Sequence, residues 1–177
     1  MLHRYGNVLN LPVICADSGK RAGTVKDLIF DSGKKEVMAL LLESAGLFLK
    51  KKAVLLEELL DFRGDAAVIS SKSCIKEIDI QDYFEVFPGI GCLIGIKVFS
   101  KSAGEIGTVS DVIFDAESGR IEGFEISDGL LQDIMQGRKM LPLVGKVEFG
   151  KDFAVVENEA VEEMQDTGGG IRNKFLK

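Results

Sequence analysis

Short runs of apolar, β-branched and aromatic residues alternate with turn residues near the start of the chain. One such run extends from Thr24 to Phe30 and ends in the turn cluster 31–33, and a second run covers 36–43. Runs of this length and composition are typical of strands, and a short glycine-containing loop between two of them predicts a β-hairpin.

The hairpin pattern recurs later in the chain. Residues 107–115 repeat seven of the nine residues of 23–31 at a constant offset, 107 − 23 = 84, with no gap. The strand predicted at 120–127 completes the second hairpin, and its Phe124 and Ile126 alternate with polar residues and so face one side. A duplication this regular predicts two similar units, each of about 70 residues, near the lower size limit for a single core.

The copies differ between the hairpin and the last strands, which are predicted at 66–70 and 153–157. In the second copy the apolar residues of 128–137 fall at helical spacing, so this segment can form about two turns of helix. Many short strands separated by close turns favour a small barrel in each unit over an open sheet. The sequence therefore predicts an all-β protein of two small barrels in tandem, with a short helical segment in the second.

The expected domain boundaries follow from composition. The first barrel should cover 1–75 and the second 91–157. The intervening 76–90 is too apolar for a free linker, so it should pack as a bridge. The remainder, 158–177, is an acidic and glycine-containing segment, and we expect it to form a mobile tail.

The duplicated motif resembles the PRC-barrel family. The resemblance rests on Gly95 with Val98, on the two copies 23–31 and 107–115, and on a Leu-Pro-Leu segment at 141–143 followed by Val147. The family includes the cytoplasmic domain of the H subunit of photosynthetic reaction centres and the C-terminal domain of a bacterial ribosome maturation factor. The resemblance implies compact β-barrels that mediate protein contacts and share no catalytic centre.

Two departures from these relatives matter. The chain has no apolar stretch of the roughly 18 residues that a membrane span needs, which disfavours a photosynthetic role and membrane insertion. It also duplicates the barrel and lacks the other domain of the ribosome factor.

The first residues show no apolar signal segment, so we expect a cytoplasmic location. A net charge of −6 disfavours binding to bare nucleic acid or anionic lipid.

The repeated polar and glycine residues are the first candidate site. Asp27 and Asp111 could act as paired acid–base carboxylates or hold a metal, but a strand or turn position favours bonding to backbone N–H groups. The same structural interpretation applies to the turn aspartates and to the glycines, which suit bends or close backbone approaches. The expected strand and turn anchors are Gly23, Asp27, Asp31, Gly107, Asp111 and Asp115. The expected core residues are Phe30, Phe114, Phe124 and Ile126.

The remaining candidates are few. His3, the single histidine, lies in the first residues and is expected to be solvated. Cys15, Cys74 and Cys92 are odd in number, widely spaced and in apolar settings, which favours buried inert thiols over a disulfide framework or metal site. The basic run Lys50–Lys52 could contact RNA phosphates, but a solvated loop is the favoured interpretation.

These observations predict a non-catalytic cytoplasmic adaptor that binds another protein through a barrel face, with no cofactor, no metal and no enzymatic activity. The alternative is a role in RNA processing or ribosome assembly, suggested by the ribosome factor and by Lys50–Lys52. A homo-oligomer is compatible with either interpretation.

Overall fold

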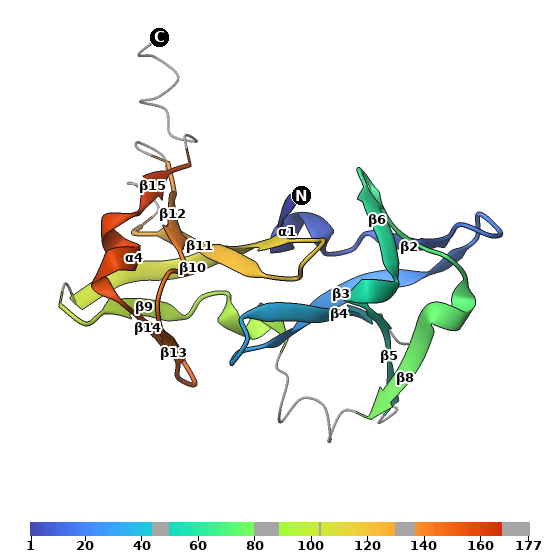
Figure 1. Ribbon diagram of the computed structural model, residues 1–177, viewed down its shortest axis with the longest axis horizontal. Helices are drawn as coiled ribbons and strands as arrows, with labels where there is room; N and C mark the ends of the chain where they lie inside the picture. Colours follow the sequence, from blue (N-terminus) through green and yellow to red (C-terminus); the bar gives the residue numbers. More distant parts are fainter. Residues whose placement is uncertain (44–49, 80–88, 103, 130–136, 168–177) are drawn as a thin grey trace, which may run out of the picture. The chain divides into compact units, whose positions relative to one another are not determined.

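The computed structural model describes residues 1–43, 50–79, 89–102, 104–129 and 137–167. It is mostly β-structure and divides into two compact units (Figure 1). The first unit consists of Met1–Gly91 together with Phe114–Ile121, and the second of Cys92–Ile113 together with Glu122–Lys177. The turn of the second hairpin, together with the strand end that carries Phe114, therefore belongs to the first unit.

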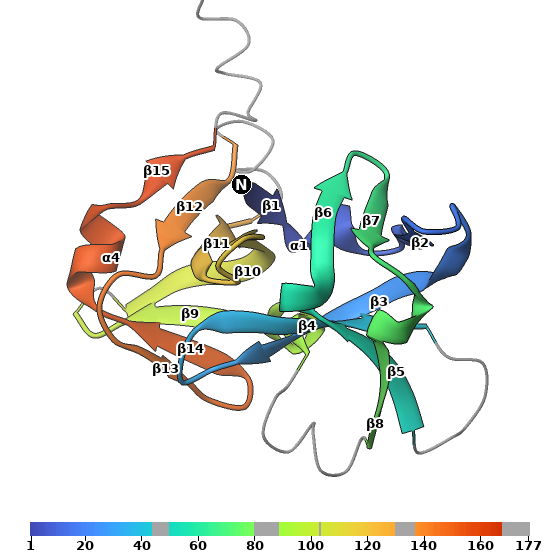
Figure 2. The same ribbon diagram turned by 45° about the vertical axis from the view of Figure 1, so that its right-hand side comes forward.

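The first unit contains a seven-stranded sheet in the order β6-β7-β2-β3-β4-β5-β8 (Figure 2). Its strands β2 and β7 pair in parallel, and the other neighbours are antiparallel. The strands of this sheet are β2 (Pro12–Cys15), β3 (Arg21–Asp31), β4 (Glu36–Leu42), β5 (Lys50–Leu55), β6 (Leu59–Arg63), β7 (Ala66–Ile69) and β8 (Ile75–Asp79). The chain begins with β1 (Leu2–Arg4) and the single turn of α1 (Tyr5–Val8).

The second unit repeats this topology. Its strands follow the order β13-β14-β9-β10-β11-β12-β15, and β14 again pairs in parallel with β9. They are β9 (Lys97–Ser100), β10 (Gly104–Asp115), β11 (Ile121–Ser127), β12 (Lys139–Pro142), β13 (Val147–Phe149), β14 (Phe153–Val156) and β15 (Gln165–Asp166). The equal strand order confirms the all-β tandem that the sequence predicts, and the predicted hairpins and final strands lie where expected.

The core is built from the residues that the repeat aligns. Phe30, Phe114, Phe124 and Ile126 are each at most 1% exposed. The simple alternation expected for β11 does not hold, because Glu125 is also buried, at 3% exposure. This carboxylate is accommodated by an ion pair with Arg138, 3.3 Å away.

Three segments differ from the sequence expectation. The expected mobile tail from 158 instead continues the second unit, because α4 (Asn158–Glu162) forms and β15 pairs with β12. The run Lys50–Lys52 lies in β5 and is not a loop, since it pairs with both β4 and β8. The first part of the bridge, 76–79, is a strand of the first sheet.

Other expectations fall outside the described residues. The rest of the bridge at 80–88, most of the helical segment expected at 128–137, and residues 168–177 lie there. None of the helices in the described part of the chain is long and apolar enough to cross a membrane.

Candidate binding groove of the first unit

Asp27 is bonded as a strand anchor. Its Oδ1 accepts hydrogen bonds from the Leu28 amide at 2.7 Å, the Tyr5 hydroxyl at 2.9 Å and the Gly91 amide at 3.1 Å. A Cβ at residue 89 would clash with the Asp27 carboxylate, so only glycine fits there while this carboxylate keeps its position. Through Oδ1, this carboxylate ties the start of the chain and residue 91 to β3.

The other repeated aspartates make local backbone bonds. Asp111 Oδ1 accepts from the Val112 amide at 2.8 Å, as Asp27 accepts from Leu28. Asp31 Oδ1 accepts from the amides two and three residues later, at 2.8 and 3.0 Å, and Asp115 Oδ1 does the same at 2.9 and 3.0 Å. This is the turn-forming bond that aspartate makes with its own backbone. Asp31 and Asp115 thus shape the two hairpin turns.

The repeated glycines permit close strand packing. A Cβ on Gly107, where φ is +154°, would lie 2.6 Å from the Ser127 carbonyl oxygen. The corresponding Cβ on Gly23 would meet only the Leu42 side chain, at 3.1 Å. The two copies therefore differ in how strictly this position requires glycine.

His3 and one cysteine are placed differently from expectation. The His3 ring is not a solvated terminal group, because it packs 4.9 Å from the Phe62 ring and 6.1 Å from the Phe114 ring. Cys15 and Cys74 are buried, but Cys92, in the 3₁₀ turn Ile90–Leu93, is exposed.

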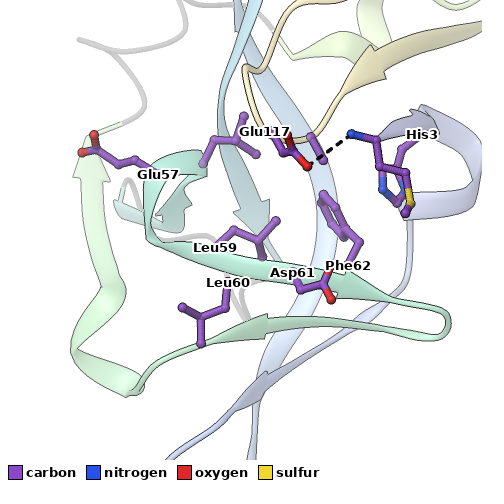
Figure 3. A pocket seen from close by; sticks show the side chains of 10 residues that line it. His3, Glu57, Leu59, Leu60, Asp61, Phe62 and Glu117 are labelled. Carbon is purple, nitrogen blue, oxygen red and sulfur yellow. Dashed lines mark ion pairs between the residues drawn. The ribbon is translucent and has the colours of Figure 1, made fainter.

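A cavity of about 320 Å³ opens beside this aromatic cluster, within the first unit (Figure 3). Phe62 points toward His3 between the strand residues and the turn of the second hairpin, while the Glu57 carboxylate points away at the margin. Leu60, one of the lining residues, is 61% exposed. The lining comprises Met1, His3, Leu56, Glu57, Leu59, Leu60, Asp61, Phe62, Ala116 and Glu117.

A second cavity of about 270 Å³ shares part of this lining. The shared residues are Leu56, Glu57 and Glu117, so the two cavities adjoin. The second is completed by Glu36, Val37, Met38, Leu55 and Ser118. We call the two cavities together the β6 groove.

The turn that forms one wall of the β6 groove is fixed by backbone bonds. The Val37 amide donates to the Gly119 carbonyl at 2.7 Å, and the Ile121 amide donates to the Lys35 carbonyl at 2.8 Å. Gly119 has φ +77°, and a Cβ there would lie 2.5 Å from the Val37 carbonyl oxygen. Only glycine allows this approach, so it is this residue that lets 116–118 line the groove.

The groove lining combines apolar and acidic side chains. Four of its lining residues are acidic, namely Glu36, Glu57, Asp61 and Glu117, and its described lining contains no lysine or arginine. Two of these carboxylates have a cation nearby: Asp61 pairs with Arg63 at 3.3 Å, and Glu117 lies 3.7 Å from the Met1 amine. The same amine pairs with Asp115 at 2.7 Å, and this bond holds the pKa of the Asp115 carboxyl well below its usual range.

Burial and neighbouring charges shift the pKa of the His3 imidazole. Burial lowers the pKa of its imidazole, and the nearby Met1 amine adds to this effect. Asp61 and Asp115 act in the opposite direction, but the net pKa shift is downward. The neutral ring is therefore the favoured form, which suits a ring packed against Phe62 and Phe114.

Sequence reasoning did not find the β6 groove. Its walls come from residues 1–3, 36–38, 55–62 and 116–118, which no local motif connects. The one available signal is the Leu59–Leu60 pair, because two consecutive leucines in an edge strand place one side chain in solvent.

A family model described as PRC-barrel domain matches the chain twice, over residues 2–70 and 91–162. No curated protein matches the chain.

Proposed function

Because the chain belongs to the PRC-barrel family, whose domains are often protein-interaction modules, we propose that it is a non-catalytic cytoplasmic adaptor that binds another protein through the β6 groove. The observation that carries the proposal is the combination of an exposed Leu60 with two adjoining cavities of about 320 and 270 Å³. Large apolar side chains exposed beside a concavity, with a polar rim, are typical of interaction sites.

The charge of the lining defines the chemistry of the partner. Four carboxylates line the groove together with apolar side chains, so a complementary partner presents apolar side chains together with lysine or arginine. The apolar contacts supply most of the affinity, whereas the exposed charges favour encounter and orientation.

The described contacts of the candidate chemical groups support a non-catalytic role. Asp27 Oδ1 accepts from three donors, and His3 packs against two aromatic rings. The register places Lys52 opposite Glu77 in β8, so a negative charge lies beside the basic run. This pairing favours protein binding over the RNA-associated alternative.

Co-purification with a surface variant tests the proposal. The full chain would be tagged and captured from its native host in three forms: unchanged, Leu60→Asp, and the control Ile94→Asp in the second unit. Ile94 is also exposed, and it lies outside the groove lining. We expect a defined partner with the unchanged chain and with Ile94→Asp, and its loss with Leu60→Asp. Equal recovery by both variants, with circular dichroism showing intact folds, would reject the groove as the binding site.

A further inference from the structure

β6 is a terminal strand of the first sheet, and among the described strands it pairs only with β7 (Figure 2). A strand in this position presents a row of backbone N–H and C=O groups on its outer side. Four consecutive residues of β6, 59–62, line the first cavity. Successive side chains of a strand point to opposite faces, so a cavity that contacts four residues in a row lies along the edge of the strand.

The pairing of β6 is irregular at its exposed leucine. Leu59 pairs with Ile69 and Asp61 pairs with Val68, so Leu60 is an extra residue with no opposite residue on β7. A bulge of this kind bends the edge and re-aims a side chain. It also disfavours indiscriminate pairing with long, flat strands. Binding at this edge therefore needs side-chain contacts as well as main-chain hydrogen bonds.

The corresponding edge strand of the second unit, β13, is regular. At the offset that aligns Phe62 with Phe149, 149 − 62 = 87, Leu60 corresponds to Val147. The register of β13 on β14 has no shift along its described length, and Val147 is partly buried. Both edges carry an exposed ion pair, so charge alone does not separate them. The bulge and the exposed leucine distinguish the edge of the first unit.

We propose that the partner binds as an extended segment that adds a strand to the β6 edge, with apolar side chains in the cavities of the β6 groove and lysine or arginine beside its carboxylates. This inference rests on the proposed function, because it assigns a binding mode to the same groove. Main-chain hydrogen bonds to β6 supply affinity, and alternate side chains of the segment enter the adjoining cavities. Leu60 packs against the apolar side chains of the segment.

Charge complementarity selects a basic segment. Glu117 and Asp61 have cations at 3.7 and 3.3 Å, and both side chains are more than half exposed. Each can therefore exchange a solvent-exposed ion pair for one with the segment. The same charges disfavour a second copy of the chain as the occupant, since pairing two β6 edges would bring two acidic linings together.

Peptide selection on the full chain tests the proposal. A displayed library of random peptides of about eight residues, which is within the usual strand length, would be selected on the unchanged chain and counter-selected on Leu60→Asp. We expect peptides in which apolar residues alternate with lysine or arginine. Apolar residues at helical spacing would overturn strand addition. If no peptide depends on Leu60 but partner capture does, strand addition fails alone; if neither depends on Leu60, the proposed function fails as well.

Backbone methylation separates strand addition from binding by side chains alone. One selected peptide would be made with N-methyl groups on its odd-numbered amides and, separately, on its even-numbered amides, because alternate amides of a strand point to opposite edges. By calorimetry, one form should bind nearly as tightly as the unmodified peptide. The other should lose more than about tenfold in affinity, because several main-chain hydrogen bonds are removed. Equal affinities of the two forms would overturn the proposal.

A matched pair of charge reversals tests the position of the segment. Asp61 and Glu148 occupy corresponding places in β6 and β13, 148 − 61 = 87. Asp61→Lys should weaken the unmodified peptide by about three- to tenfold at low salt and less at high salt, whereas Glu148→Lys should leave its affinity unchanged. Equal affinities in the two variants would contradict the placement beside β6. A Leu60-dependent dimer of the chain alone, seen by sedimentation, would assign the edge to a second copy and overturn the proposal.

Discussion

Phe114 should stabilise the first unit although its sequence belongs to the second repeat. Its side chain is fully buried, and its ring lies 6.3 Å from Phe62 in an edge-to-face arrangement and 6.1 Å from His3. The substitution Phe114→Ala would remove this ring from the core of the first unit. We therefore expect a loss of stability that is large for a single residue.

The magnitude follows from burial. Removing a fully buried phenylalanine side chain costs about 3–5 kcal/mol, which combines the lost transfer free energy with the cavity left behind. Phe153 provides a control, since it is 45% exposed and packs at an edge-to-face distance of 6.5 Å from Phe99. Phe153→Ala should cost about 1 kcal/mol, because roughly half of the transfer free energy is at stake and no enclosed cavity forms. At about 2–4 °C per kcal/mol for a chain of this size, Phe114→Ala should lower the melting temperature by about 6–20 °C.

Thermal unfolding followed by circular dichroism measures both variants. Hydrogen exchange then locates the effect, and the amides of β6 should lose more protection in Phe114→Ala than in Phe153→Ala. A melting temperature for Phe114→Ala equal to that of Phe153→Ala would refute the assignment of this residue to the core of the first unit.

Three further predictions concern the residues around the groove. Because burial lowers the pKa of the His3 imidazole, its NMR titration should have a midpoint below the ordinary 6.5. The folded state should then lose stability as the pH falls through 6.5. A midpoint at or above 6.5 would contradict the burial of this ring. Asp115→Asn should keep the turn bonds but lose the ion pair with the Met1 amine, so above about pH 4 at low salt it should destabilise the fold more than the matched Asp31→Asn. Because the pKa of the Asp115 carboxyl is depressed, this difference in stability should fade as the pH drops below 3.8. Equal destabilisation by the two variants at every pH would argue against the ion pair. Gly119→Ala should lower the free energy of unfolding by about 2–4 kcal/mol and Gly19→Ala by about 1 kcal/mol. Both residues have positive φ, but only a Cβ on residue 119 would meet a carbonyl oxygen, that of Val37. Equal melting temperatures for the two variants would show that the backbone of Gly119 does not pack tightly against the Val37 carbonyl.

The fold was predictable because the sequence contains the same hairpin motif twice. The repeated 23–31 and 107–115 fix two hairpins, and buried Phe30 and Phe114 occupy the same place in each. The aspartates at the hairpin turns follow from the same local reasoning, because aspartate bonds its own backbone in any turn of this kind.

The groove was not predictable, since it depends on contacts between segments distant in sequence. The turn 116–118 belongs to the second repeat but lines a cavity of the first unit, and no periodicity encodes that placement. His3 was misjudged for the same reason: its position near the start of the chain suggested solvent, whereas Phe62 and Phe114 provide the packing. The burial of Glu125 was not predictable either. Strand alternation places its side chain on the opposite face from Phe124, and the alternation does not show that Arg138 lies beside it.

Site-specific photocrosslinking tests most directly whether the β6 groove is a protein-binding site. A photoreactive amino acid would replace Leu60 in the full chain within its native host, and a matched variant would carry it in place of Phe153. We predict that irradiation of the Leu60 variant gives a discrete heavier species, in which a second protein is attached through a segment of apolar and basic residues, and that the Phe153 variant does not. The same pattern of heavier species from both positions, or none from Leu60, would contradict the assignment of partner binding to this groove.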